Sequence, residues 1–186
     1  MTKQFPVRGL KELDAYLSAF PKNLQKGAVR SGLRQAANQI ADEAKLRAKG
    51  RLAKSITVGS ARVNEDGKIS IRVYVDESIG IGFVGYFQEF GVRPHLIGST
   101  GKGEGRIAIR KAKAGTGTVE NGVMKIGDDF ASGIISHPGH APNPFLRPAL
   151  DVKAKQAVEA FADQVQEYLY SKTGLMAPYV EVGEAA

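Results

Sequence analysis

Apolar residues recur at helical spacing through the first third of the chain. The first run follows Gly9 and consists of Leu10, Leu13, Leu17 and Phe20. This spacing predicts a short helix, and Pro21 favours a break and restart because proline fits the first turn of a helix. From residue 22 to about 49, a narrow apolar stripe predicts a long helix with one buried face, closed by Gly50. The stripe consists of Val29, Leu33, Ala36, Ala37, Ile40 and Ala44.

Beyond this helix the apolar period changes to two residues, which is typical of β-strands. Apolar and polar residues alternate around Ile56 and Val58 and again over residues 68–75, with a turn at residues 64–67 between the two runs. The pattern predicts an antiparallel hairpin with one buried and one solvated face.

The middle of the chain is rich in glycine, with 14 of the 22 glycines between residues 80 and 139. A second hairpin is predicted over residues 118–126, around an Asn-Gly turn. Residues 98–117 combine six glycines with basic side chains. Because long glycine-rich excursions are seldom structural filler, we expect a flexible loop there, flanking a short strand at about residues 107–109.

Four prolines between residues 138 and 148 precede a C-terminal helix that begins near Pro148 and ends at Gly174. Its predicted buried face consists of Leu150, Ala154, Ala157, Val158, Phe161, Val165 and Leu169. The order of elements predicts an α+β fold, in which N-terminal helices and the long C-terminal helix pack on an antiparallel sheet of hairpins. We expect a single domain over residues 1–174 and a C-terminal tail over residues 175–186.

The composition narrows the class of protein. The chain has 186 residues and no cysteine, which excludes a disulfide scaffold, a thiolate zinc site and a cysteine nucleophile. No apolar run approaches the ~18 residues of a membrane span, and the polar N-terminus is not typical of a signal peptide. We therefore expect a soluble cytoplasmic domain that does not enter a membrane.

The positive charge is confined to one part of the chain. Residues 1–54 hold 12 Lys and Arg against four Asp and Glu, whereas the remaining 132 residues hold 14 against 15. The whole basic excess therefore lies in the predicted N-terminal helices. Such a face is suited to phosphate or to an acidic protein surface, and an ordinary solvated helix face is an equally good explanation.

Residues 80–85 match the glycine spacing of a dinucleotide-binding fingerprint. That motif works only where the N-terminus of a following helix receives the pyrophosphate, within a βαβ unit. Here Gly91 and Pro94 follow within nine residues and no βαβ pattern surrounds the motif. We predict a bent strand at this position and no bound cofactor.

The histidines raise the question of a metal site. His137 and His140 are three residues apart, but the Pro-Gly pair between them favours a turn over shared ligation of a metal. No plausible nucleophile–base arrangement accompanies them. We expect no metal, no cofactor and no enzymatic activity.

Three segments of the chain resemble a known family. They are residues 85–91 (Gly-Tyr-Phe-Gln-Glu-Phe-Gly), residues 94–97 (Pro-His-Leu-Ile) and residues 137–150 (His-Pro-Gly-His-Ala-Pro-Asn-Pro-Phe-Leu-Arg-Pro-Ala-Leu). In this order they are similar to the neck proteins of long-tailed phages, which are variously called head–tail joining, tail-completion or minor tail proteins. The resemblance extends over about residues 5–170, and the Pro-Phe-Leu-Arg-Pro-Ala segment is its most specific part. Val92 stands where the family often has threonine.

This resemblance implies a structural virion protein, assembled in the host cytoplasm. It implies a sixfold ring of copies of the chain that joins the tail tube to the head and lets DNA pass. The implied partners are other neck and tail-tube proteins, with non-specific contact to DNA in the channel. The implied architectural residues are Glu89, Phe90, Gly91, His95, His137, Pro138, Gly139, Pro144, Phe145 and Arg147.

The charges in these segments allow a further expectation. Glu89 and Arg147 lie in otherwise apolar segments, so each needs a partner, and we expect them to pair with one another, within a subunit or between subunits. The basic candidates for an interface or a DNA-facing surface are Arg30, Arg34, Lys45, Lys102 and Arg106. The alternative function is a stand-alone basic nucleic-acid-binding protein, although the chain has no Trp and no helix-turn-helix or zinc pattern.

Overall fold

The computed structural model describes residues 6–79, 82–98, 123–126, 129–132 and 134–183. They fall into two compact units. The first comprises residues 1–89 and 144–186, and the second comprises residues 90–143. The single domain predicted over residues 1–174 stays a prediction.

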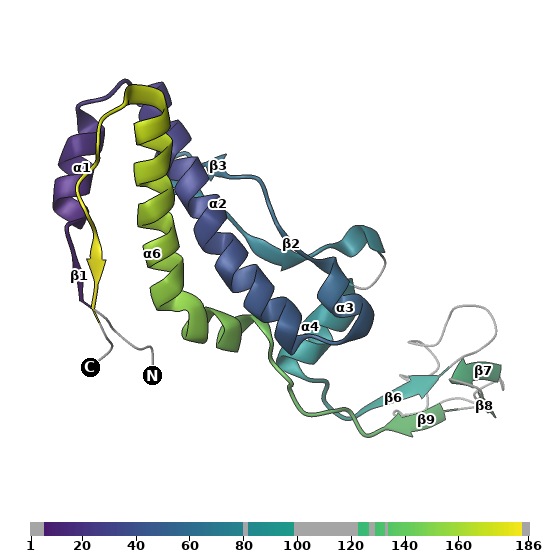
Figure 1. The fold of residues 1–186 in the computed structure, drawn as a ribbon. Coiled ribbons are helices and arrows are strands. Elements are labelled where there is room, and N and C mark those ends of the chain that lie inside the picture. The colour runs from purple at the N-terminus through teal and green to yellow at the C-terminus, as the bar shows by residue number, and fades with distance from the viewer. Residues whose placement is uncertain (1–5, 80–81, 99–122, 127–128, 133, 184–186) are drawn as a thin grey trace. The chain divides into compact units, whose positions relative to one another are not determined.

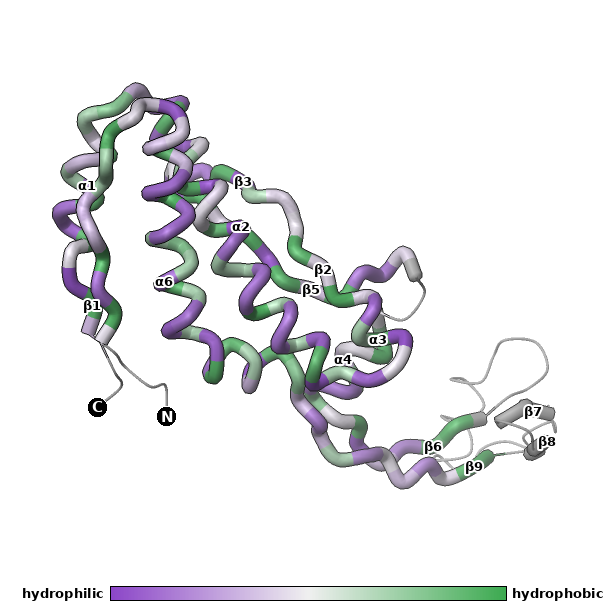
Figure 2. The backbone as a smooth tube through the Cα atoms, in the orientation of Figure 1, coloured by the Kyte–Doolittle hydropathy of each residue, from purple (hydrophilic) through white to green (hydrophobic). Residues whose placement is uncertain are grey.

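Two long helices form the framework of the first unit. Helix α2 (Lys22–Arg47) and helix α6 (Leu146–Thr173) lie side by side and run in opposite directions (Figure 1). Apolar and polar residues alternate along both helices, as expected where one face is buried (Figure 2). The predicted limits of α2 and α6 are confirmed to within a few residues, and α6 ends at Gly174, whose φ of 69° forms the left-handed cap.

The buried face of α2 is lined by smaller residues than the sequence predicts. The buried residues of α2 are Ala28, Gly32, Ala37, Ala41 and Ala44, whereas Val29, Leu33, Ala36 and Ile40 are half-buried. Small side chains let α6 approach closely. A Cβ on Gly32 would lie 2.8 Å from side-chain atoms of both Phe161 and Val165.

The buried face predicted for α6 is only partly correct. Ala157, Val165 and Leu169 are buried as predicted, and Ala149 and Ala162 join them. Leu150 is 50% exposed, because the contact with α2 is made by the alanine before it. The prediction failed there because it gave weight to the larger apolar side chain, and close helix contacts favour the smaller one.

Helix α1 (Leu10–Ser18) packs at the end of the pair where α2 begins. Leu13 of α1 is buried among Ala28 of α2 and Val165 and Leu169 of α6. As predicted, Pro21 separates α1 from α2 and occupies the N-cap of α2.

The C-terminal segment predicted as a tail contains a short strand. Strand β10 (Glu181–Val182) pairs antiparallel with strand β1 (Val7–Arg8). Val180 and Val182 are buried, so the chain beyond α6 contributes to the core between residues 180 and 182. This strand could not be predicted, because two residues are too few to show a period.

The link between α2 and the hairpin differs from the prediction at Gly50. Helix α2 ends at Arg47, Ala48 is extended, and Gly50 opens helix α3 (Gly50–Ser55) with a φ of 58°. Gly50 therefore starts a helix, whereas we predicted that it would end one. Ala48 and Leu52 are buried together, and this shared packing fixes the turn between the two helices.

The predicted first hairpin is confirmed. Strand β2 (Ile56–Val58) pairs with β5 (Val73–Val75), and β3 (Arg62–Val63) pairs with β4 (Ile69–Ser70), all antiparallel around a turn at residues 64–67. Its apolar face packs on the core that α2 and α6 share. At the turn, the hydrogen bond from the Lys68 side chain holds the pKa of Asp66 below its usual 3.8.

A short 3-10 helix (Glu77–Ile79) follows the hairpin and precedes helix α4 (Gly82–Phe90). In the 3-10 segment, a hydrogen bond from the Ser78 backbone N–H lowers the pKa of Asp76.

The second unit is built of antiparallel strand pairs. Strand β6 (His95–Gly98) pairs with β9 (Ile134–His137), and β7 (Val123–Ile126) pairs with β8 (Asp129–Ser132). The first strand and turn of the second predicted hairpin, residues 118–122, lie outside the described residues. So do the loop at residues 99–117 and its predicted strand at 107–109.

The predicted α+β class is confirmed, and the strands of the described residues are arranged as five two-stranded pairs. Within the described ranges, no helix is both long and apolar enough to cross a membrane.

Candidate functional site

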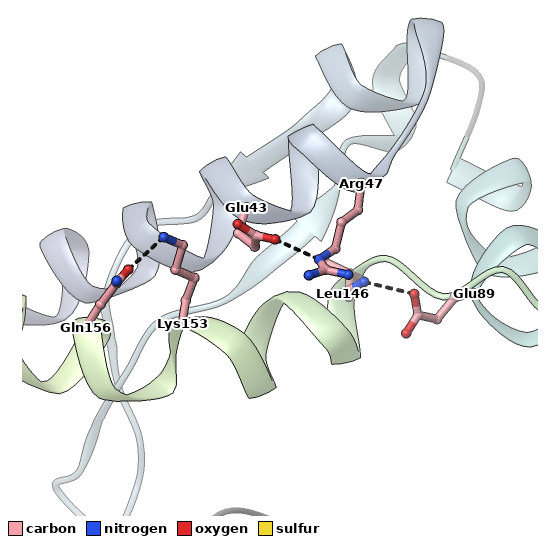
Figure 3. A network of polar contacts seen from close by, with 6 residues as sticks. All are labelled: Glu43, Arg47, Glu89, Leu146, Lys153 and Gln156. Carbon is pink, nitrogen blue, oxygen red and sulfur yellow. Dashed lines mark hydrogen bonds and ion pairs between the residues drawn. The ribbon is translucent and has the colours of Figure 1, made fainter. Parts of the chain in front are cut away.

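Helix α4 ends in a carboxylate that caps the start of α6. Glu89 is only 5% exposed, and its Oε2 accepts a hydrogen bond from the backbone N–H of Phe145 at 2.8 Å. The same oxygen accepts another from the backbone N–H of Leu146 at 3.0 Å (Figure 3). Its Oε1 accepts a third from the backbone N–H of Arg147 at 3.2 Å. Anionic oxygens at a helix N-terminus satisfy donors that the helix cannot pair and interact favourably with its dipole.

Proline completes this arrangement. The next residue in the first turn of α6 is Pro148, which has no N–H to satisfy. One carboxylate and one proline thus account for the donors at residues 145–148. Phe145, the N-cap residue, offers no side-chain acceptor of its own, so α6 depends on a residue 56 positions earlier in the chain.

The predicted ion pair between Glu89 and Arg147 is present within the chain. Arg147 Nε lies 3.6 Å from Glu89 Oε1, and the arginine side chain is 65% exposed. The exposed guanidinium is screened by water, whereas the three backbone donors lie against a buried carboxylate. The main partners of Glu89 are therefore backbone N–H groups, which sequence reasoning missed. The signal was available, since Phe-Leu-Arg-Pro places three unpaired donors immediately before a proline.

In the second unit the predicted motif residues form a tight backbone crossing. Val92 and His140 exchange two backbone hydrogen bonds, of 3.0 and 2.9 Å. Gly139 has a φ of 75°, and a Cβ at this position would overlap the carbonyl oxygen of Val92. Gly91 has a φ of 74°, and a Cβ at this position would lie 2.8 Å from the backbone nitrogen of Pro142. These glycines are required by the close approach of two chain segments, and Pro138 lies between β9 and this crossing.

Two of the histidines lie directly opposite one another. His95 of β6 and His137 of β9 are register partners, with ring centroids 4.9 Å apart. His137 Nδ1 accepts a hydrogen bond from the backbone N–H of Gly139 at 3.0 Å, so this nitrogen carries no proton. His95 Nδ1 lies 2.9 Å from the Arg93 carbonyl oxygen and donates to it. Over the described ranges, no three His, Asp or Glu side chains are grouped so that they could hold a metal.

The segment predicted as a bent strand is helical. Residues 82–90 form α4, because Phe83, Tyr86, Phe87 and Phe90 recur at helical spacing. Gly85 lies against Val75, where a Cβ would come within 2.8 Å of the valine Cγ2. No βαβ unit precedes α4, since β5 pairs antiparallel with β2, and nothing in this geometry supports binding of a dinucleotide.

The outer side of α4 carries an aromatic face, which consists of Phe83, Tyr86, Phe87 and Phe90. Their exposed fractions are 62%, 62%, 42% and 50%. Edge-to-face contacts join Phe87 to Phe83 and Tyr86, with ring centroids 6.0 and 6.1 Å apart. Sequence reasoning missed this face because the prediction of a bent strand relied on the glycines of the segment and did not consider the helical spacing of its aromatic residues.

Three of the five predicted basic candidates for an interface or DNA-facing surface lie among the described residues. Arg30 and Arg34 are exposed on α2, one turn apart. Lys45 is also exposed, and it pairs with Asp42 at 3.0 Å. Lys102 and Arg106 lie outside the described residues. Whether any of these five cations meets DNA or a protein stays a prediction.

Comparison with known protein families gives a match in the N-terminal part of the chain. Residues 11–91 match the family of HK97-gp10-like proteins, described as "Bacteriophage HK97-gp10, putative tail-component". The match covers most of α1, all of α2 and α3, the hairpin and the whole of α4, including Glu89. The match supports the resemblance to phage neck proteins over these residues. Phe145 and Arg147, which Glu89 contacts, lie beyond the matched residues. No curated protein and no solved structure gives a significant match.

Proposed function

We propose that the chain is a subunit of a sixfold ring at the head–tail junction of a long-tailed phage. The ring joins the tail tube to the head, lets DNA pass, and binds other neck and tail-tube proteins. A family of structural tail components also argues against a catalytic role. The observation that carries the proposal is the aromatic face of α4, which lies within the region matched to that family.

The aromatic face is large enough to nucleate a subunit contact. A fully buried Phe or Tyr contributes about 150–250 Å², so four rings about half exposed offer roughly 300–500 Å². One partner of a stable complex contributes about 800 Å². The aromatic face alone therefore supplies about half of a subunit interface, and aromatic residues dominate the binding energy of such interfaces.

A second exposed apolar surface favours another copy of the chain as the partner. The C-terminal apolar segment, which consists of Leu175, Met176 and Tyr179, is 55%, 81% and 75% exposed. It follows the end of α6, whereas α4 lies at the end of the helical pair where α6 begins (Figure 1). A closed ring needs two unlike surfaces on each subunit, one for each neighbour. The chain carries such a pair.

Native mass spectrometry with negative-stain imaging tests this proposal. We expect a closed ring for the wild type and a monomer of unchanged helicity for the Phe83→Ser/Phe87→Ser variant. The Met176→Ser/Tyr179→Ser variant should also be monomeric. Leu46→Ser is the matched control, because Leu46 is an 82% exposed apolar residue outside both surfaces, and its ring should persist.

Mixing the two monomeric variants makes the test sharper. Each mixed pair retains one intact aromatic face and one intact C-terminal apolar segment, so the mixture should form a one-to-one heterodimer that cannot grow. A wild type that stays monomeric at every concentration contradicts the proposal. So does a ring formed by either the Phe83→Ser/Phe87→Ser or the Met176→Ser/Tyr179→Ser variant alone.

A further inference from the structure

The solvated side of the first hairpin carries polar side chains on both strands. Thr57 and Tyr74 are register partners, and so are Arg62 and Ser70. Between these two pairs the register shifts by one residue, which is the signature of a β-bulge. The extra residue lies between Gly59 and Arg62, and the Gly59 N–H donates to the Arg72 carbonyl oxygen at 2.8 Å, which continues the β2–β5 register.

The bulge opens a hollow on this polar side. The hollow has a volume of about 500 Å³, with Gly59 in its wall. Its polar lining consists of Ser60, Arg62, Asn64, Ser70, Arg72 and Tyr74. The Tyr74 ring lies against Gly59, where a Cβ would come within 3.2 Å of the ring, and is 44% exposed.

The hollow has an unbalanced positive charge. Arg62 and Arg72 both line it, and neither forms an ion pair with another residue of the described chain. Among the described residues, the lining includes no carboxylate. Of the two acidic residues in the turn, Asp66 is paired with Lys68 at 2.8 Å, and Glu65 is not part of the described lining. The two guanidinium groups are therefore available to an external anion.

We propose that this hollow binds the sugar–phosphate backbone of DNA. The side-chain types that contact phosphate and sugar in protein–DNA complexes are Arg, Lys, Ser, Thr, Asn, Gln and Tyr, and all six polar lining residues are of these types. Arginine binds phosphate through paired hydrogen bonds. Ser70 Oγ donates to Asn64 Oδ1 at 3.2 Å, so the Asn64 amide N–H₂, which has no acceptor among the described residues, is able to donate to a phosphate oxygen.

An acidic protein segment is the competing ligand, and two features favour DNA over it. Hydroxyl and amide donors accompany the arginines, which suits the several oxygens of a phosphodiester chain. The exposed part of the Tyr74 ring also offers a surface for a sugar or an unstacked base. The site reads no base edges, so binding is independent of sequence and steeply dependent on salt.

This inference rests on the passage of DNA in the proposed function but not on the ring itself. It also moves the expected DNA contact from the α2 residues Arg30 and Arg34 to the hairpin. Binding can be measured on the full chain in any oligomeric state. A loss of binding without a loss of the ring, or the reverse, therefore separates the two proposals.

The test is fluorescence anisotropy with a labelled random-sequence DNA duplex at several salt concentrations. Arg62→Ala/Arg72→Ala should lower the affinity on the order of tenfold at low salt and reduce the slope of log affinity against log salt by about two. Arg30→Ala/Arg34→Ala is the matched control, because it removes the same two charges from another exposed face. We expect that control to bind nearly as well as the wild type.

Three results overturn the proposal. They are a wild type that does not bind the duplex at low salt, equal losses in both double variants, and Arg62- and Arg72-dependent binding of polyglutamate without binding of DNA. The last result would identify an acidic protein as the partner. A single-stranded probe of the same length shows in addition whether Tyr74→Ala weakens binding to unpaired bases more than binding to the duplex, as stacking predicts.

Discussion

Removing the Glu89 carboxylate should destabilise the whole α2–α6 framework. Glu89 accepts three backbone hydrogen bonds at 2.8, 3.0 and 3.2 Å, and the Phe145 donor is itself buried. Hydrogen bonds to charged groups contribute about 1.5–3 kcal/mol each and are not additive, and leaving a buried donor unpaired costs about 1–3 kcal/mol. We therefore expect Glu89→Ala to lower the free energy of unfolding by about 3 kcal/mol.

Glu89→Gln removes the negative charge of the side chain but keeps its size and shape. The amide keeps one acceptor oxygen but directs N–H₂ toward backbone donors, so we expect a loss of about 2 kcal/mol. For a chain of this size, each kcal/mol lowers Tm by about 2–4 °C. Glu89→Ala should therefore unfold roughly 6–12 °C below the wild type. Urea unfolding followed by far-ultraviolet circular dichroism, at one fixed protein concentration, measures both variants.

Glu159→Gln is the control for this experiment. Glu159 forms an exposed pair with Lys155 at 3.9 Å on the same helix, and such a pair contributes less than about 1 kcal/mol. Arg147→Ala should also have a small effect, because its guanidinium is mostly solvated. The capping argument is wrong if Glu89→Gln is as stable as Glu159→Gln, or if Arg147→Ala costs as much as Glu89→Ala.

Three further predictions follow from the fold. Gly32→Ala should lower the free energy of unfolding in urea by about 1–3 kcal/mol, because the added methyl group meets Phe161 and Val165, and this outweighs the better helix propensity of alanine. Gly27→Ala should lower it less, since its methyl group meets only the end of the Tyr168 side chain. Equal losses in the two variants would contradict this. Gly139→Ala should speed amide exchange at Val92 and His140, while Gly67→Ala, which has a similar φ but open space around it, should leave that exchange unchanged. The lowered pKa of Asp66 means that its stabilising contribution is complete above about pH 3.8 and is lost as the pH falls through the folded-state pKa. An NMR titration should show this low pKa in the wild type and a shift toward 3.8 in Lys68→Ala.

The sequence was sufficient to predict the elements in which the apolar pattern repeats over a long stretch. The long helices and the first hairpin were found because their apolar residues repeat over many positions. Their packing was less predictable, because the α2–α6 contact is made by glycine and alanine, whose burial follows from a partner helix and not from their own hydrophobicity. Strand β10 was missed for a different reason, since two residues carry no period.

The candidate site was predictable in its residues and not in its chemistry. Glu89 and Arg147 were singled out as charges in apolar segments, and they do approach one another. The dominant contacts of Glu89 are to backbone N–H groups, which are the same in every residue and leave no trace in the sequence except the absence of one at Pro148. Helix α4 was misjudged because three glycines suggested a bend, although its aromatic residues repeat at helical spacing.

The central claim is that this chain is a ring subunit at the head–tail junction, and a cryo-electron microscopy map of the phage particle tests it most directly. The account predicts a ring around the DNA channel at the neck, with the paired helices α2 and α6 resolved in each subunit. The aromatic face of α4 should lie against the C-terminal apolar segment of the neighbouring copy. A neck fully accounted for by other proteins, in particles that lack this chain, would contradict the claim.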